Sequence, residues 1–206
     1  MNHDLEFLQR AQELIEAGRA LDARGWVPAT SGNLSARLAN GDIAITLSGR
    51  AKGRLTLEDI VRLDAQGRPL DGRQPSAETA LHLALYRRYP KARAVLHLHA
   101  LGAVLASRLF ENQLVLTDHE LLKALEGIKT HAHRLVVPIF PNDQDIERLA
   151  HKIDTYMEDR HGEFYSFILA GHGFYTWGSS VEAALRQAEA LEFMFDCEVR
   201  LYGAKL

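Results

Sequence analysis

Apolar side chains recur along the chain in two alternating patterns, one with a helical period and one made of short continuous runs. Spacings of three and four residues predict amphipathic helices, and short apolar runs between turn-forming residues predict buried strands. The helices predicted in this way cover residues 3–24, 77–89, 101–109, 118–126 and 143–160, and a further long helix ends near Tyr202. The predicted strands are residues 34–38, 43–47, 94–100, 113–116, 135–140, 164–170 and 174–177.

Turn and capping residues mark where several of these elements begin and end. Asn40-Gly41, between the first two strands, is a strong signal for a hairpin. Ser76 is a suitable N-cap for the helix that follows it, and Ser179-x-x-Glu182 has the form of a capping box at the start of the last helix. Pro138 lies inside a predicted strand, which places that strand near an edge of the sheet.

Strands and helices alternate along the whole chain without a repeat, a low-complexity segment or a linker. The hairpins predict a sheet that is mostly antiparallel or mixed, and helices must cover both of its faces. We therefore expect an α/β fold with three layers, αβα, in a single domain that spans residues 1–206.

The composition narrows the classes of protein to which the chain can belong. Of its 206 residues, 47% are hydrophobic and 25% are charged, which suffices for a full core. The net charge of -3 gives no reason to expect nucleic acid or an anionic membrane as a partner, and no apolar run approaches the roughly 20 residues of a membrane span. Residues 1–4 lack a signal pattern, and Cys197, expected as a buried thiol on a helix, is the only cysteine. We expect a cytoplasmic protein.

The predicted strand at residues 94–100 carries two histidines, His97 and His99, that point to the same side because they are two residues apart. His172 lies between two glycines, where a sharp turn would project its imidazole out of the sheet. Three histidines with an open fourth position are typical of a catalytic zinc site. The alternative, that these are ordinary core or surface histidines, remains open on residue chemistry alone. The other histidines singled out are expected in solvent: His3, His131, His133, His151 and His161.

Two carboxylates and three small-residue segments are further candidates for chemistry. Glu78 and Glu120 each lie near a predicted helix start, where a carboxylate also simply favours the helix dipole, and residue chemistry does not separate the two roles. Backbone N–H groups and hydroxyls in three segments suit an anion, although each segment is equally an ordinary turn. These segments are Thr30-Ser31-Gly32-Asn33, Ser48-Gly49-Arg50-Ala51-Lys52 and Pro75-Ser76-Ala77.

The order of these pieces along the chain resembles the class II aldolase/adducin family. The resemblance rests on residues 30–35, Ser48-Gly49, Pro75 to Glu78, His97-Leu98-His99 and His172-Gly173, and it covers nearly the whole chain. Residues 117–125, 135–139 and 172–178 are similar to the branch of that family that dehydrates a methylthio-substituted ketose 1-phosphate in methionine salvage.

This resemblance implies a fold, a metal and a set of roles. It implies one zinc ion per subunit, held by His97, His99 and His172, and a homotetramer that binds a small sugar phosphate. It makes Glu120 the acid/base, whereas Glu78 matches the glutamate that aldolases of the family use near the metal. The residues implied in binding the phosphate are Ser31, Gly32, Asn33, Ser48, Gly49, Lys52 and Ser76.

The implied reaction is dehydration through an enediolate that zinc stabilises. Because an aldolase uses the same intermediate, the metal ligands do not choose between the two reactions. A sugar-phosphate aldolase of the fuculose or rhamnulose 1-phosphate type, or a ribulose-phosphate epimerase, therefore stays as an alternative. A non-catalytic, adducin-like interaction module is the second alternative.

Overall fold

The computed structural model describes residues 3–160 and 163–204, and its centre is an eight-stranded mixed sheet. The strands are β1 (Asn33–Arg37), β2 (Ile43–Thr46), β3 (Ile60–Leu63), β4 (Ala94–Leu98), β5 (Gln113–Leu116), β6 (Leu135–Phe140), β7 (Ser166–Leu169) and β8 (Gly173–Gly178). In space they follow the order β3-β2-β1-β4-β8-β7-β6-β5. Neighbouring strands run antiparallel, except that β6 and β7 run parallel. His97 and His99 therefore lie at the end of β4 and His172 lies just before β8, and these two strands are hydrogen-bonded neighbours.

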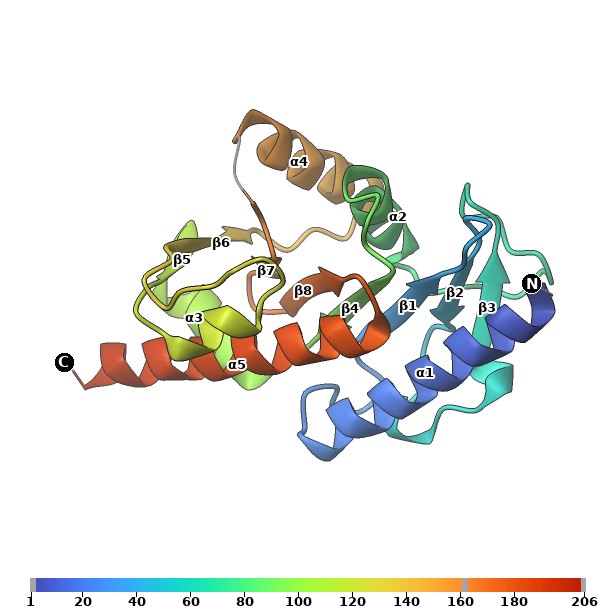
Figure 1. The fold of residues 1–206 in the computed structure, drawn as a ribbon, viewed down its shortest axis with the longest axis horizontal. Coiled ribbons are helices and arrows are strands. Elements are labelled where there is room, and N and C mark those ends of the chain that lie inside the picture. Colours follow the sequence, from blue (N-terminus) through green and yellow to red (C-terminus); the bar gives the residue numbers. More distant parts are fainter. Residues whose placement is uncertain (1–2, 161–162, 205–206) are drawn as a thin grey trace.

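Helices cover both faces of this sheet (Figure 1). They are α1 (His3–Ala23), α2 (Thr79–Arg88), α3 (Leu101–Leu109), α4 (Ile146–Asp159) and α5 (Val181–Gly203), with the short 3-10 turns η1 (Lys52–Arg54), η2 (Leu57–Asp59) and η3 (Glu120–Ala124). Helices α2 and α4 pack on one face, whereas α1, α3 and α5 pack on the other. The expected three-layer αβα fold is confirmed.

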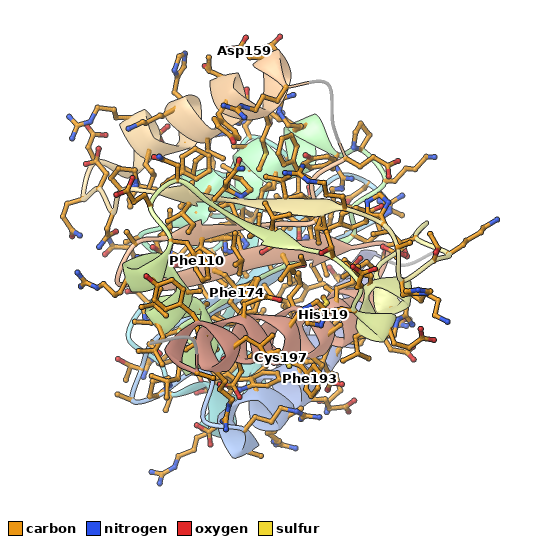
Figure 2. All side chains as sticks on the ribbon, turned by 90° about the vertical axis from the view of Figure 1, so that its left-hand side faces the viewer. Phe110, His119, Asp159, Phe174, Phe193 and Cys197 are labelled. Atoms are coloured by element: carbon orange, nitrogen blue, oxygen red, sulfur yellow. The ribbon has the colours of Figure 1, made fainter. Side chains whose placement is uncertain are left out.

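Side-chain alternation along β4 explains why this strand lies in the middle of the sheet. Leu96 and Leu98 point into the core that the sheet forms with α1, α3 and α5, and Val95 points into the core under α2 and α4. Figure 2 shows the same layering, with Phe174 of β8 between the sheet and α5 and with Asp159 of α4 on the opposite side. A strand buried on both faces is a rigid support for the side chains at its end.

Three local predictions, of a helix type, a helix cap and a helix start, differ from the structure. Within the segment at 118–126, residues 120–124 form the 3-10 turn η3 rather than an α-helix, and Asp118 and Gly127 on its flanks both have positive φ. The cap of α5 is Ser180, whose hydroxyl accepts the Ala183 N–H at 3.0 Å, since the Ser179 hydroxyl instead donates to Glu126.

The third difference is the start of α2 at Thr79, two residues later than predicted. The Thr79 N–H and hydroxyl both donate to the Ser76 carbonyl, which forms a separate turn before the helix. The Ser76 hydroxyl accepts the Glu78 N–H at 3.3 Å and so does not cap the helix itself. Pro138 lies on β6, which is next to the edge strand β5, in agreement with the predicted position near an edge of the sheet.

Other expectations concern exposure. His131 and His151 are exposed, as expected, whereas His133 and Cys197 are half-buried. His161 and the side chain of His3 lie outside the described residues. Among the helices that the structure describes, none has the length and hydrophobicity that crossing a bilayer requires.

Candidate metal centre

The end of β4 fixes the first two histidines. His97 is the fourth residue of this strand, it is fully buried, and it pairs with Asn33 of β1 and Tyr175 of β8. His99 follows the strand, and its backbone N–H donates to the Trp26 carbonyl at 2.9 Å. Backbone hydrogen bonds therefore hold both residues before any ligand binds.

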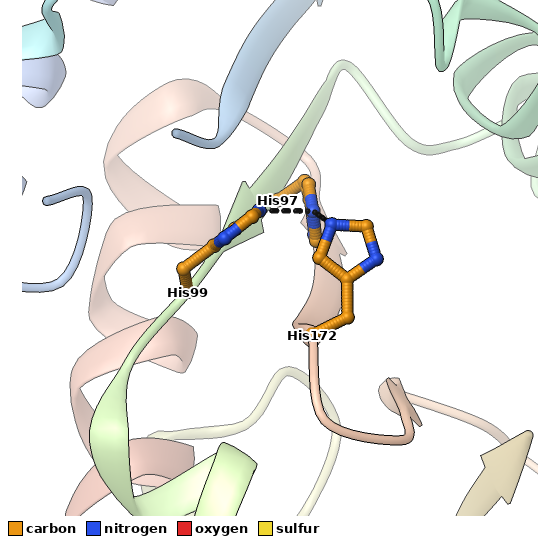
Figure 3. A group of neighbouring side chains, drawn as sticks. All are labelled: His97, His99 and His172. Atoms are coloured by element: carbon orange, nitrogen blue, oxygen red, sulfur yellow. Dashed lines mark hydrogen bonds between the residues drawn. The ribbon is translucent and has the colours of Figure 1, made fainter. Parts of the chain in front are cut away.

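The turn between β7 and β8 brings the third histidine to the same place (Figure 3). Gly171 has a φ of +66°, a conformation that side chains other than hydrogen rarely adopt. A Cβ atom on Gly173 would lie 2.0 Å from the Leu98 carbonyl oxygen, so only glycine allows the turn to lie directly on β4. The two glycines that flank His172 thus have the role that the sequence predicts.

The three imidazoles point their Nε2 atoms at one another. His97 Nε2 lies 3.0 Å from His99 Nε2 and 3.3 Å from His172 Nε2, and all three ligand atoms lie within 4.8 Å of one another. His97 Nδ1 donates to the Phe174 carbonyl at 3.0 Å, and His172 Nδ1 donates to the Asn142 side-chain oxygen at 3.2 Å. Since Nδ1 carries the proton in both rings, the Nε2 lone pairs are free to face a cation.

The two separations from His97 Nε2 are close to those of a tetrahedral zinc site. Nitrogen ligands about 2.1 Å from zinc lie about 3.4 Å from one another in a tetrahedral site. Burial lowers the pKa of His97 well below its usual value, and the neighbouring His99 and His172 lower it further. Burial, followed by His172, lowers the pKa of His99 to about 4. Both rings are therefore neutral at pH 7, which is the form that binds a metal.

Glu78 is the carboxylate beside this cluster. Its Oε2 lies 3.3 Å from His97 Nε2, and its Oε1 lies 3.6 Å from His172 Nε2. Asn33 donates a hydrogen bond of 2.6 Å from Nδ2 to Glu78 Oε2. The ring of Tyr175 stacks on His97 with a centroid separation of 4.1 Å, which closes the other side of that imidazole. Glu78 is thus in place either to ligate a cation or to exchange a proton beside it.

Glu120 lies elsewhere in the chain. It begins η3, its side chain is 70% exposed, and it forms an ion pair with Lys123 that lowers the pKa of its carboxyl. The turn η3 packs against α5, whereas His97 points to the sheet face that α2 and α4 cover. The fold therefore does not bring Glu120 to the histidines of its own chain.

The three small-residue segments do come together. The Lys52 ammonium donates to the Thr30 carbonyl at 2.9 Å and to the Arg50 carbonyl at 2.6 Å, which joins the first two segments. A β-bridge between Leu47 and Pro75 joins the second segment to the third. Lys52 is 1% exposed, and burial lowers its pKa to about 8.

The individual candidates in these segments differ in what they offer a ligand. Ser48 and Gly49 are exposed, and Gly32 precedes Asn33 at the start of β1. The Ser31 hydroxyl is buried and has no hydrogen-bond partner among the described residues. Ser76 is buried, and its hydroxyl already accepts the Glu78 N–H. The unpaired Ser31 hydroxyl, close to the loops that Lys52 joins, suits a ligand with hydrogen-bond acceptors.

Sequence reasoning missed three side chains around the cluster: Asn142, Tyr175 and His82. His82 had a usable signal, since it follows Glu78 by four residues and so shares its helix face. Asn142 and Tyr175 become neighbours of the histidines only through strand register, which the sequence does not display.

Comparisons with known proteins agree with this geometry. A sequence model described as "Class II Aldolase and Adducin N-terminal domain" matches residues 12–199. Methylthioribulose-1-phosphate dehydratase from Methylococcus capsulatus is 64% identical over 98% of this chain and 99% of its own length. The protein of that name from Pseudomonas savastanoi pv. phaseolicola is 49% identical over 94% of this chain and 95% of its own. Among solved structures, L-fuculose-1-phosphate aldolase from Thermus thermophilus superposes with a TM-score of 0.76 at 27% identity, covering 96% of this chain and 97% of that one.

Proposed function

Because the chain belongs to the class II aldolase and adducin family, we propose that it is a lyase that dehydrates 5-methylthioribulose 1-phosphate to 2,3-diketo-5-methylthiopentyl 1-phosphate. The observation that carries this proposal is 64% identity to a dehydratase of that name over 98% of the chain. This reaction belongs to methionine salvage. We also propose that residues 1–206 act as one domain, since a single sheet order runs through all the described strands.

The metal is proposed to be zinc, about one ion per chain, with His97, His99 and His172 as ligands. When bound, zinc supplies Lewis-acid chemistry that draws electron density from carbonyl and hydroxyl oxygens and so acidifies the adjacent C–H. Within the chain, the Phe174 carbonyl and Asn142 orient two of the three ligands. Glu78 adds a negative charge beside them.

Glu120 is proposed as the acid/base of the dehydration. Its carboxylate would take the proton from C3 and would return a proton to the C4 hydroxyl as that C–O bond breaks. Water leaves, and the resulting enol becomes the 2,3-diketone, so that atoms balance. Since η3 lies on the far side of the sheet from His97, Glu120 would act at the histidines of a second copy of the chain. The proposed assembly is therefore a homo-oligomer, with a tetramer as the expected form.

The phosphate is proposed to bind at the three joined segments. The described residues that would contribute are Ser31, Gly32, Asn33, Ser48, Gly49, Lys52 and Ser76. Support comes from the orphaned Ser31 hydroxyl and from the buried positive charge of Lys52 between the first two segments. Lys52 already uses two donors on loop carbonyls, so one N–H remains for an anion.

A product assay tests the proposed function. The purified full chain is incubated with 5-methylthioribulose 1-phosphate, with and without a chelator, and the product is followed by mass spectrometry and phosphorus NMR. Loss of one water from the substrate is expected, with the rate abolished by the chelator and restored by added zinc. Cleavage of fuculose or rhamnulose 1-phosphate without dehydration would instead favour the aldolase, and inversion of ribulose 5-phosphate the epimerase. Metal-free protein with no turnover would favour the interaction module.

A further inference from the structure

A chain of buried side chains leads from the helix α2 to the metal cluster. The Tyr86 hydroxyl lies 2.8 Å from Ser35 Oγ, and Ser35 Oγ lies 2.7 Å from His82 Nδ1. His82 Nε2 is hydrogen-bonded to Asn33 Oδ1, and Asn33 Nδ2 donates to Glu78 Oε2. His82 and Ser35 are fully buried, so water does not supply these bonds.

The direction of every bond in this chain follows from its last member. A carboxylate oxygen accepts, so the amide nitrogen of Asn33 faces Glu78 and its oxygen faces His82. His82 Nε2 must then carry the proton, which leaves Nδ1 to accept from the Ser35 hydroxyl. Ser35 in turn accepts from Tyr86. All donors point toward Glu78, an arrangement in which each bond polarises and strengthens the next.

We infer that His82 is a positioning residue that fixes the Asn33 amide and, through it, holds the Glu78 carboxylate at the histidine cluster. The inference rests on the proposed function, because it assigns His82 a task in that reaction. Burial lowers the pKa of His82 to about 3, so the ring stays neutral and keeps the required tautomer at neutral pH. Its edge also contacts Tyr175 at 5.7 Å between ring centroids, and Tyr175 stacks on His97.

This inference also limits the proposed role of Asn33 in phosphate binding. The side-chain amide has one oxygen and two N–H groups. His82 occupies the oxygen and Glu78 takes one N–H, so one N–H of Asn33 remains for substrate. Asn33 therefore links the carboxylate to the phosphate segments in a fixed geometry.

A matched pair of variants tests this role. His82→Gln keeps an N–H that can reach Asn33, whereas His82→Met has similar length and no donor. We expect kcat for 5-methylthioribulose 1-phosphate to fall about 10- to 100-fold in His82→Met and several-fold less in His82→Gln, with a smaller rise in KM because Asn33 also has one N–H for the phosphate. Bound zinc, measured by elemental analysis, should stay near the wild-type content in both. Tyr86→Phe, at the far end of the chain, should retain most of the activity.

The outcomes separate the inference from the proposed function. If the wild type does not dehydrate the substrate, the proposed function fails. If the wild type is active and the two His82 variants have equal kcat, His82 acts only through packing and the inference is wrong. Ser35→Ala is made in parallel, in case His82→Met does not fold, with folding followed by thermal unfolding. It leaves His82 Nδ1 without its hydrogen-bond donor, which loosens the ring, and should lower kcat several-fold with a smaller change in KM, whereas wild-type kcat in folded Ser35→Ala would overturn the inference.

Discussion

Glu78 and Glu120 have similar positions in the sequence, each near the start of a helical segment, but the fold places them in opposite environments. Glu78 has a side chain that is 13% exposed, accepts a hydrogen bond from Asn33 and lies within 3.6 Å of two imidazoles. Glu120 is 70% exposed and is paired with Lys123. Contacts within the chain therefore fix the Glu78 carboxylate, whereas the Glu120 carboxylate faces outward.

The difference shows which parts of the site a single chain can preorganise. Bonds within the chain fix His97, His172 and Glu78, so these side chains need no second copy to be in place. The η3 turn is also anchored, since His119 bonds Glu198 of α5 at 2.8 Å, and Asp118 before it has a φ of +59°. An anchored turn that directs a carboxylate away from the histidines of its own chain supports the proposal that the site is shared between copies.

The largest expected effect comes from removing His172, a proposed zinc ligand that lies beside Glu78. His172→Ala should reduce bound zinc from about one ion per chain to nearly none and lower turnover about a thousandfold or more, because several kcal/mol of transition-state stabilisation are lost. Elemental analysis and the dehydration assay measure both effects. His151→Ala, an exposed histidine of α4, is the control. Normal metal content in His172→Ala would mean that His172 does not hold the metal.

The Glu120 side is expected to behave differently. Glu120→Gln should lower turnover about 10²- to 10⁴-fold, the range for loss of a general acid/base, while bound zinc stays at the wild-type level. The exposed ion pair with Lys123 contributes little to stability, so the thermal unfolding midpoint should hardly change.

A mixing experiment sharpens the same prediction. When His172→Ala and Glu120→Gln chains are co-expressed with different tags, each site that combines a wild-type histidine set with a wild-type Glu120 should work. For random assembly this is about a quarter of the sites, so about a quarter of wild-type activity should return. If the co-purified mixture stays inactive, Glu120 does not act across a subunit boundary.

The sequence predicts the metal side of this comparison better than the Glu120 side, for physical reasons. His97 and His99 share a face by strand alternation, and the glycines around His172 predict a tight turn, so both signals are local. The strand order that makes β4 and β8 neighbours is not local, and the family resemblance implied only that the three histidines meet. At residues 118–126 the sequence predicts an α-helix, and it reveals neither the positive φ of Asp118 nor the bond from His119 to Glu198 of α5, which depends on the tertiary fold.

The three small-residue segments show the same limit of prediction from sequence. Each has the small residues of an anion-binding turn, and the sequence presents Lys52 simply as an added charge. Only the fold shows that its ammonium ties two loops together through the Thr30 and Arg50 carbonyls. A buried lysine is rare enough to be noticed, but its burial depends on α1, which lies far away in sequence and packs on η1.

The smallest expected effect tests whether the buried charge of Lys52 contributes to binding of the substrate phosphate. Burial lowers the pKa of Lys52 from 10.5 to about 8, so the wild-type side chain loses its proton as pH rises from 7 to 9. The positive charge proposed to attract the substrate phosphate is lost with it, and KM should rise several-fold over this interval with a smaller change in kcat. In Lys52→Met, KM should already be raised at pH 7 and should stay flat to pH 9. The folded state releases this proton at lower pH than the unfolded chain, so wild-type stability relative to Lys52→Met should increase between pH 8 and pH 10.5. A wild-type KM that is constant from pH 7 to pH 9 would mean that the Lys52 charge does not help to bind the phosphate, and that its two carbonyl bonds are its only contribution.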